Sequence, residues 1–188
     1  NMCKGYAKTE LYSGVTTIRT VGGVADFDTK VRDLIEAGKT PGPRILAGNM
    51  AVSVPGGHMA GSLAYEAHNV EEGKYFTETI VKEHPNLIKL MITGGVLDAK
   101  AKGEPGELKM SPEIVKACCD VAHKNGLTVA AHVESPEGVR VALENGVDTI
   151  EHGAKPDDEI IKLFKDRKAA HICTISPALP FALFDREI

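Results

Sequence analysis

The chain has 188 residues, of which 43% are hydrophobic and 26% are charged, so it holds enough apolar material for one sizeable core. Its formal net charge of −4, its aromatic content of 5% and its lack of tryptophan argue against the basic, aromatic-lined surface of a nucleic-acid-binding protein. No apolar run approaches the roughly 20 residues that span a bilayer. We therefore expect a globular protein whose partners include neither nucleic acid nor a membrane.

The predicted elements alternate between helices and strands, beginning with a helix within residues 2–13. The predicted strands are 14–23, 43–48, 86–93, a stretch ending at His132, a stretch ending at His152, and 170–176. The helices predicted between them lie at 26–38, 70–83, 111–125, from 136 onward, and at 156–167. Ser111-Pro112 and Asn125-Gly126 are typical start and stop signals for the 111–125 helix. Residues 50–69 are predicted to form a polar, glycine-containing loop.

Six strands that alternate with helices and read as continuous apolar runs are typical of a buried parallel sheet. Both an open doubly wound sheet and a (β/α)8 barrel fit this pattern, but the first strand is followed by TVGGVADF, which lacks the G-x-G-x-x-G of a dinucleotide-binding fold. The barrel is favoured because polar side chains end strand after strand, as they do at Arg19, Lys89, His132, His152 and Thr174.

A complete (β/α)8 barrel has eight strands and at least about 200 residues. We therefore interpret residues 1–188 as the central part of one barrel domain, with about six of the eight strands present. The first and last strands would lie outside the chain. Two exposed strand edges would then favour association into a homo-oligomer.

Lys89 lies in the middle of the apolar stretch Leu87–Met91, and strand alternation places Leu87, Lys89 and Met91 on one face. Lysine is rarely buried without a partner. One interpretation is an edge strand with Lys89 pointing outward. The other is a buried amine whose pKa is lowered, so that it can act as a nucleophile or take up CO₂ as a carbamate that bridges two cations.

His132 and His152 end two apolar strands that are separated by one helix, and they are 20 residues apart. Because the carboxyl ends of neighbouring parallel strands meet at one edge, the two side chains are expected to lie close together. A single histidine there is most often a core residue, but a matched pair favours a metal site, since neutral imidazole is a common zinc ligand. Alternation predicts that His152 shares a face with Ile150 and that Glu151 points the opposite way.

The cysteines suggest a reducing compartment. Cys118 and Cys119 are adjacent within a predicted helix, which suits neither a disulfide framework nor a zinc finger, and we interpret all four cysteines as buried, reduced thiols. The amino-terminal residues NMCKGYAKTELYSG lack the apolar core of a signal peptide. A cytoplasmic location is therefore predicted.

Several segments, taken in order, resemble the amidohydrolase superfamily, in the branch of imidazolonepropionase-like enzymes and Xaa-Pro dipeptidases. They are GVTTIRTVGG, GPRILAGN, GGHMAG, IKLMITGG, VAAHVESPEGVRVALENGVDTIEHG and ICTISPAL, which together span nearly the whole chain. The resemblance implies a metal-dependent (β/α)8 barrel with a small β-sandwich built from both chain ends. That sandwich is not expected within these residues.

The resemblance also implies the site and the reaction. Lys89 would be the carboxylated lysine that bridges two ions, most simply zinc, and His132 and His152 would be their histidine ligands. The implied activity is hydrolysis of a C–N bond in a small-molecule amide, dipeptide or cyclic amide by a metal-bound hydroxide. The family's His-x-His pair does not occur, and Asp185 stands in the wrong context for its last aspartate. The chain alone is therefore expected to be inactive.

Three further residues are candidates for binding substrate. His58 in the GGHM segment resembles a substrate-binding loop histidine, although an exposed loop histidine is an equal alternative. Thr93 begins a glycine loop after the Lys89 strand, where a plain turn is the alternative. Glu134 follows His132 by two positions, where it could bind a cationic group or cap the helix that starts at 136.

Two other classes of function stay open from the residues alone. In one, Lys89 is the Schiff-base nucleophile of an aldolase-like lyase barrel, with glycine loops that hold phosphate. In the other, the chain is a degenerate barrel that serves as a binding or assembly module. The substrate itself is not identified by the sequence.

Overall fold

The computed structural model describes residues 2–102 and 104–174. Within these ranges the α-helices are α1 (Met2–Tyr12), α2 (Phe27–Glu36), α3 (Val70–Val81), α4 (Pro112–Lys124), α5 (Pro136–Glu144) and α6 (Asp158–Arg167). The strands are β1 (Thr17–Arg19), β2 (Arg44–Leu46), β3 (Ala51–Ser53), β4 (Ala64–Glu66), β5 (Leu87–Met91), β6 (Thr128–Val133), β7 (Thr149–His152) and β8 (Ala170–Ile172).

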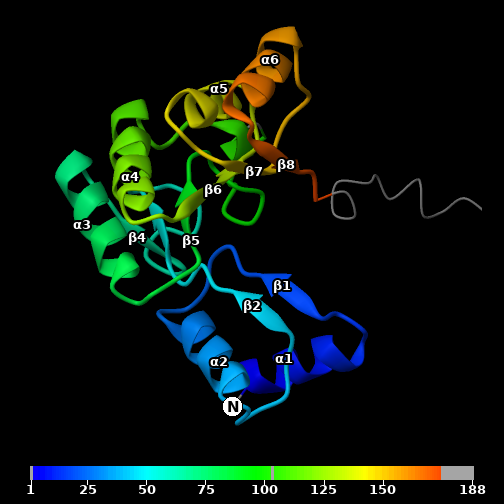
Figure 1. Cartoon of the computed structure of the whole chain (residues 1–188). Coiled ribbons are helices and arrows are strands. Elements are labelled where there is room, and N and C mark those ends of the chain that lie inside the picture. Colours follow the sequence, from blue (N-terminus) through cyan, green and yellow to red (C-terminus); the bar gives the residue numbers. More distant parts are fainter. Residues whose placement is uncertain (1, 103, 175–188) are drawn as a thin grey trace, which may run out of the picture.

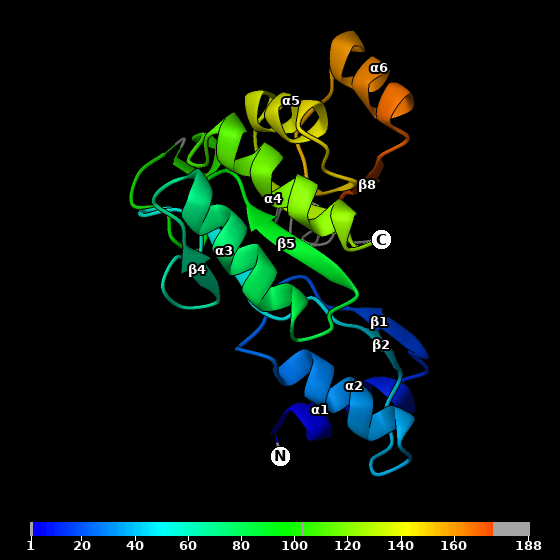
Figure 2. The same ribbon diagram turned by 60° about the vertical axis from the view of Figure 1, so that its left-hand side comes forward.

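All pairs between these strands are parallel, and they form two sheets. The larger sheet has the order β4-β3-β5-β6-β7-β8, and the smaller one pairs β1 with β2. Helices α3, α4 and α5 lie along one face of the larger sheet, while α1 and α2 accompany the smaller sheet (Figures 1 and 2). This is an α/β fold with the architecture of an incomplete (β/α)8 barrel, as the sequence predicted.

The two faces of the larger sheet differ in character because side chains alternate along each strand. On β5, Ile88 and Leu90 belong to the main hydrophobic core beneath the helices. Met91 instead packs against Ala51 and Ala64 on the concave face, and Lys89 shares this face by alternation. The concave face corresponds to the barrel interior, where the polar side chains collect.

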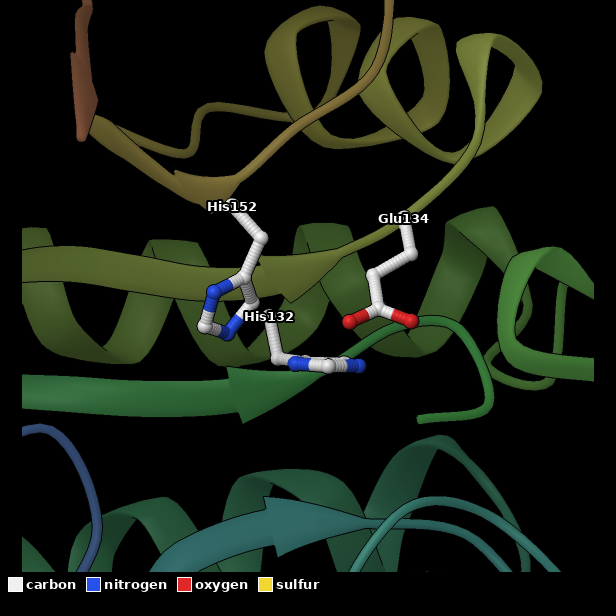
Figure 3. Close-up of side chains that lie close together, drawn as sticks. All are labelled: His132, Glu134 and His152. Atoms are coloured by element: carbon white, nitrogen blue, oxygen red, sulfur yellow. The ribbon is translucent and has the colours of Figure 1, made fainter. Parts of the chain in front are cut away.

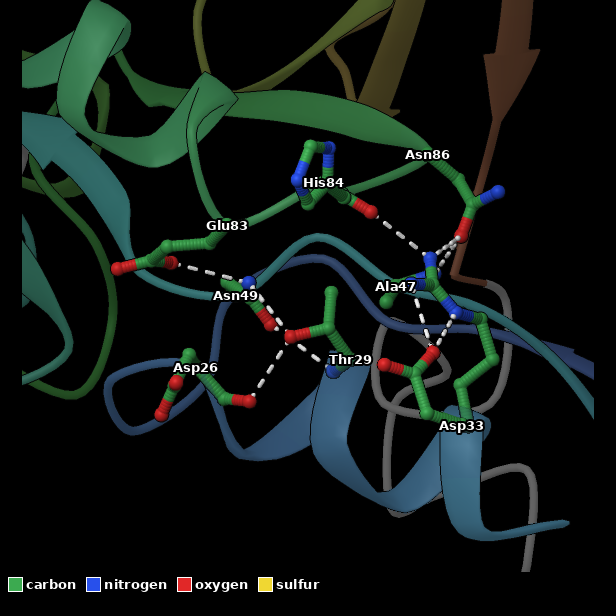
Figure 4. A network of polar contacts seen from close by, with 9 residues as sticks. Asp26, Thr29, Asp33, Ala47, Asn49, Glu83, His84 and Asn86 are labelled. Carbon is green, nitrogen blue, oxygen red and sulfur yellow. Dashed lines mark hydrogen bonds and ion pairs between the residues drawn. The ribbon is translucent and has the colours of Figure 1, made fainter. Parts of the chain in front are cut away.

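A network of polar contacts joins the smaller sheet and its helix to the rest of the molecule (Figure 4). Asn49 lies between β2 and β3 with a positive φ of 53°, accepts a hydrogen bond from the Thr29 backbone at 3.1 Å and donates one to Glu83 at 3.0 Å. Arg32 on α2 donates to the backbone carbonyl of His84 and to the Asn86 side chain, each at 2.9 Å. These contacts fix α2 against the segment that leads into β5.

The predicted elements are all present, but one predicted loop is wrong. Residues 50–69 contain the short strands β3 and β4, which the sequence pattern missed because a three-residue strand carries almost no periodic signal. Helix α4 begins at Pro112, and Gly126 after it has φ +72°, as the start and stop signals predicted. The last strand ends at Ile172, and residues 175 and 176 of the prediction lie outside the described part of the chain.

The cysteine prediction is confirmed only for the helical pair. Cys118 and Cys119 are buried in the main core, whereas Cys3 and Cys173 are exposed. Within the described residues, no helix has both the length and the hydrophobicity needed to cross a bilayer.

Candidate metal centre

His132 lies on the concave face at the end of β6, where it is 3% exposed. Its neighbours Ala131 and Val133 belong to the core on the other face, so the ring direction follows ordinary alternation. The Nε2 atom lies 3.0 Å from the carbonyl oxygen of Gly94. Because a carbonyl only accepts, Nε2 carries the proton and Nδ1 keeps the lone pair that a cation needs.

The His152 side chain lies on the same face as His132, but its backbone conformation is different. Its φ of +67° is a left-handed conformation that breaks the alternation of β7. Ile150 therefore packs in the core while the His152 ring meets His132, with ring centroids 4.8 Å apart at an interplanar angle of 66°. The expectation that His152 shares a face with Ile150 is wrong, because the chain turns at its last strand residue.

Contacts around His152 hold this unusual backbone. The Nε2 atom of His171 donates to the His152 carbonyl at 2.8 Å, and a Cβ on Gly153 would stand 2.1 Å from that Nε2. Gly153 has φ +81°, so both space and conformation call for glycine. The Nδ1 atom of His152 lies 2.9 Å from the Thr174 hydroxyl, which leaves Nε2 available.

Glu134 joins the two histidines, as Figure 3 shows. One ligand atom from each of His132, Glu134 and His152 lies within 4.8 Å of the others. Burial raises the pKa of the Glu134 carboxyl. The cap of α5 is Ser135, whose hydroxyl accepts from Gly138 at 3.2 Å, so the alternative that Glu134 caps this helix is wrong.

Thr93 positions Glu134. Its side chain is fully buried, accepts a hydrogen bond from the Glu134 backbone at 3.0 Å and donates one to the Gly94 carbonyl at 2.9 Å. The same Gly94 carbonyl receives the His132 ring N–H. Thr93 therefore connects two members of the cluster through the backbone.

The electrostatics of the cluster suit a cation. Burial lowers the pKa of His132 to about 3, although its hydrogen bond to Gly94 acts in the opposite direction. Burial and nearby Lys89 also lower the pKa of His152. Both imidazoles are therefore neutral near pH 7, which is the form that binds metal. Two neutral imidazoles and a carboxylate are donors that zinc commonly takes, so the chemistry of this donor set fits a divalent ion.

Lys89 lies on the same concave face and is 2% exposed, so the alternative of an outward-facing lysine is wrong. Burial lowers its pKa to about 7; nearby Glu151 opposes this shift and Arg19 adds to it. Glu151 also points into the interior, where it binds Arg19 at 2.7 Å, so the expectation that it points away from the face of His152 is wrong. The amine is thus poised between its charged and neutral forms at neutral pH.

His58 adds a third imidazole. Its ring stacks on that of His132 with centroids 4.1 Å apart, and it is buried, so the alternative of an exposed loop histidine is wrong. Asp98 accepts hydrogen bonds from His58 Nδ1 and, at 3.0 Å, from the Met59 backbone. Sequence analysis missed Asp98 because nothing in the 94–109 loop marks it as a partner of a residue 40 positions earlier.

Two hollows help to locate the site. A cavity of about 420 Å³ opens beside His58 and Asp98, between the loops that follow β3 and β5. A larger groove of about 680 Å³ lies between α3 and α4, on the outer side of the molecule and away from the imidazoles. The smaller, more polar cavity is therefore the one next to the candidate chemistry.

Comparisons with known proteins point in one direction. Ochratoxinase of Aspergillus niger is 25% identical over 190 residues, which cover 88% of this chain and 38% of that protein. The solved structure of a proposed prolidase from Bifidobacterium longum has a TM-score of 0.81 and 42% identity, over 96% of this chain and 46% of that one. A Xaa-Pro dipeptidase structure with bound methionine has a TM-score of 0.81 and 31% identity, over 93% and 45% of the two chains.

The chain thus spans less than half the length of each of these relatives. The model of the amidohydrolase family matches residues 1–187, which is nearly the entire chain. Together with the incomplete barrel and the histidines at its rim, this match shows that the chain belongs to the amidohydrolase family.

Proposed function

We propose that the chain is the central part of the catalytic barrel of a metal-dependent hydrolase that cleaves a C–N bond in an amide, dipeptide or cyclic amide. The observation that carries this proposal is the convergence of His132, His152 and Glu134 within 4.8 Å, on the face of the sheet that also buries Lys89. In this proposal the first and last strands and the β-sandwich lie outside residues 1–188, and the 188-residue chain alone is inactive.

His132 and His152 would hold the metal, and Lys89, carboxylated on Nζ, would bridge two zinc ions. The neutral imidazoles and the buried amine of Lys89 support these roles. When bound, such ions make hydroxide available at neutral pH and polarise the substrate carbonyl. The Gly94 carbonyl and the Thr174 hydroxyl would keep the two rings oriented by holding their other nitrogens.

His58, Thr93 and Glu134 would serve the substrate. His58 stacks on His132 and borders the polar cavity, so it is suited to contact a polar group of the substrate. Asp98 would keep His58 in one orientation by accepting from its Nδ1. Glu134 would bind a cationic group or add a ligand to the metal, and Thr93 would keep its backbone in place.

The proposed substrates are small molecules with an amide-type bond. Support comes from two relatives, a Xaa-Pro dipeptidase and a proposed prolidase, whose names denote cleavage of such bonds. A cytoplasmic location and association into a homo-oligomer belong to the same proposal. The buried thiols Cys118 and Cys119 agree with a reducing compartment.

The test uses the full gene product that carries these 188 residues. We expect about two zinc ions per chain and turnover of a panel of Xaa-Pro and other dipeptides, with loss of both zinc and turnover after chelation. Turnover that survives complete removal of metal would contradict the proposal.

The same preparation tests the Schiff-base alternative. The lowered pKa of Lys89, about 7, also suits a nucleophilic amine. Borohydride in the presence of a keto substrate would then trap a covalent adduct on Lys89. We expect no adduct at Lys89 from the zinc-loaded protein, because the nitrogen is already committed to the carbamate.

A further inference from the structure

A partly buried ion pair spans the barrel interior, on the face of the sheet that carries Lys89. Arg19, the last residue of β1, donates from Nη2 to Glu151 Oε1 on β7 at 2.7 Å, and the Glu151 residue is 4% exposed. Thr149 completes the set, since its hydroxyl accepts from Arg19 Nη1 at 3.1 Å and donates to the same Oε1 at 3.0 Å. Two residues thus hold one carboxylate oxygen from opposite sides of the interior.

Lys89 lies at the same level of the sheet as Thr149, because strand register pairs Lys89 with Ala130 on β6 and Ala130 with Thr149 on β7. The charges of Glu151 and Arg19 both act on the pKa of Lys89, the first raising it and the second lowering it. Across the described residues, the Lys89 side chain nonetheless makes no hydrogen bond, and every hydrogen bond to the Glu151 side chain comes from Arg19 or Thr149. Glu151, the carboxylate that raises the pKa of Lys89, is therefore already bound to a different cation, Arg19.

If Arg19 were absent, Glu151 would pair with Lys89 instead. A buried carboxylate needs a cation, and without Arg19 the Glu151 carboxylate would be left with Lys89, the buried cation on which its charge already acts. In an ion pair with Glu151, the Lys89 side chain on β5 would be protonated and would point toward β7. It could not also present its lone pair to another reactant at the rim.

We propose that Arg19 is a positioning residue that holds Glu151 away from Lys89 and so keeps the Lys89 amine free to take up CO₂. This inference rests on the proposed function, in which Lys89 bears a carboxyl group. In the step itself the lone pair of the amine nitrogen forms a bond to the carbon of CO₂. One carbon–oxygen π bond opens to leave a negative oxygen, and the proton lost from nitrogen passes to water.

The competing view is that Arg19 and Glu151 only stabilise the barrel. The two views differ in a double variant, because removing both charges still breaks the ion pair but leaves no carboxylate to capture Lys89. The variants are Arg19→Met, Glu151→Gln and the two combined, with Thr149→Val as the matched control that keeps the direct Arg19–Glu151 contact. All are made in the full gene product and checked for folding by circular dichroism.

The readouts are the carbamate carbon signal in ¹³C NMR after exposure to ¹³C-bicarbonate, and the zinc content after loading. We expect Arg19→Met to lose at least about fivefold of the carbamate signal and of the second zinc ion. Glu151→Gln, Thr149→Val and the double variant should stay within about twofold of the wild type.

Three results would overturn the proposal. One is a wild-type carbamate signal in folded Arg19→Met, and another is a double variant as depleted as Arg19→Met. The third is loss of the carbamate signal in Glu151→Gln. This variant tests the inference even if Arg19→Met does not fold. A wild-type protein that binds zinc without any carbamate would instead remove the role of Lys89 from the proposed function, and this inference with it.

Discussion

The rings of His132 and His152 meet at 4.8 Å although their backbones approach the point in different ways. His132 leaves a regular strand, while His152 has a left-handed backbone with φ +67°. A non-glycine residue in this region is uncommon and is usually held by its surroundings. Here His171 and Gly153 hold it, so the meeting of the two rings depends on residues of the three successive strands β6, β7 and β8 and the turn after β7.

Replacing His152 by asparagine should weaken zinc binding by at least about tenfold, or about 1.4 kcal/mol, because one imidazole ligand is lost. Asparagine tolerates the left-handed backbone, so the loss reports on the ring and not on strain. The matched control is His123→Asn, since His123 contacts Asp148 on the outer side of the sheet. Competition with a zinc chelator measures both affinities. Equal affinity in the two variants would remove His152 from the site.

Replacing Lys89 by methionine should stabilise the fold while preventing the binding of two ions. The folded pKa of about 7 lies below the ordinary 10.5, so between these values the unfolded chain binds more protons and stability rises with pH. Methionine removes this penalty, and we expect a gain on the order of 1–4 kcal/mol at pH 7. Urea unfolding of the metal-free proteins, with chelator present, should show the gain shrinking from pH 7 to pH 9. A variant less stable than wild type at pH 7 would contradict the burial argument.

Acid should destabilise the metal-free protein through His132. Its pKa falls from 6.5 to about 3 on folding, so the unfolded chain binds the extra proton between these values. The neutral His132 ring therefore makes its full contribution to the free energy of unfolding above pH 6.5. Below pH 6.5 this contribution falls by up to about 1.4 kcal/mol for each pH unit. His132→Gln should show a shallower decline between pH 6.5 and 4 in chemical unfolding with chelator present. Parallel curves for the two proteins would contradict this prediction.

Removing the Thr93 hydroxyl should loosen Glu134. In Thr93→Val the Glu134 backbone N–H loses its acceptor, and we expect a stability loss of about 1–3 kcal/mol and weaker zinc binding. Thr93→Ser keeps the hydroxyl and serves as the control that separates hydrogen bonding from packing. Thermal unfolding and zinc titration measure the two effects. If serine and valine behave alike, the hydroxyl does not position the cluster.

Gly95→Ala should displace His58 without touching the metal ligands. A Cβ at Gly95 would stand 2.1 Å from His58 Nδ1, far inside contact distance. We expect kcat/KM of the full gene product to fall about 10–100-fold, equivalent to about 1.4–2.7 kcal/mol, with zinc content unchanged. Gly5→Ala is the control, because nothing lies within 4 Å of its added Cβ. Loss of zinc in Gly95→Ala would mean that the loop supports the metal and not the substrate.

Most helices and strands of this chain could be predicted from its sequence. Ser111-Pro112 and Asn125-Gly126 mark the ends of α4 because capping and left-handed turns depend on the residues at those positions. The burial of Lys89 was predictable as one alternative, since strand periodicity places it on the face of Leu87 and Met91. The matched strand ends at His132 and His152 followed from the spacing of one strand, helix and strand.

The tertiary structure decided what local pattern leaves open. The left-handed backbone of His152 reverses the alternation that its position predicts, and no local signal at a histidine requires it. Asp98 and His58 meet from loops 40 residues apart, and Arg19 and Glu151 meet from strands 132 residues apart. Period and propensity describe a residue and its near neighbours, whereas these pairs arise only when the sheet curls and brings distant strand ends to one interior.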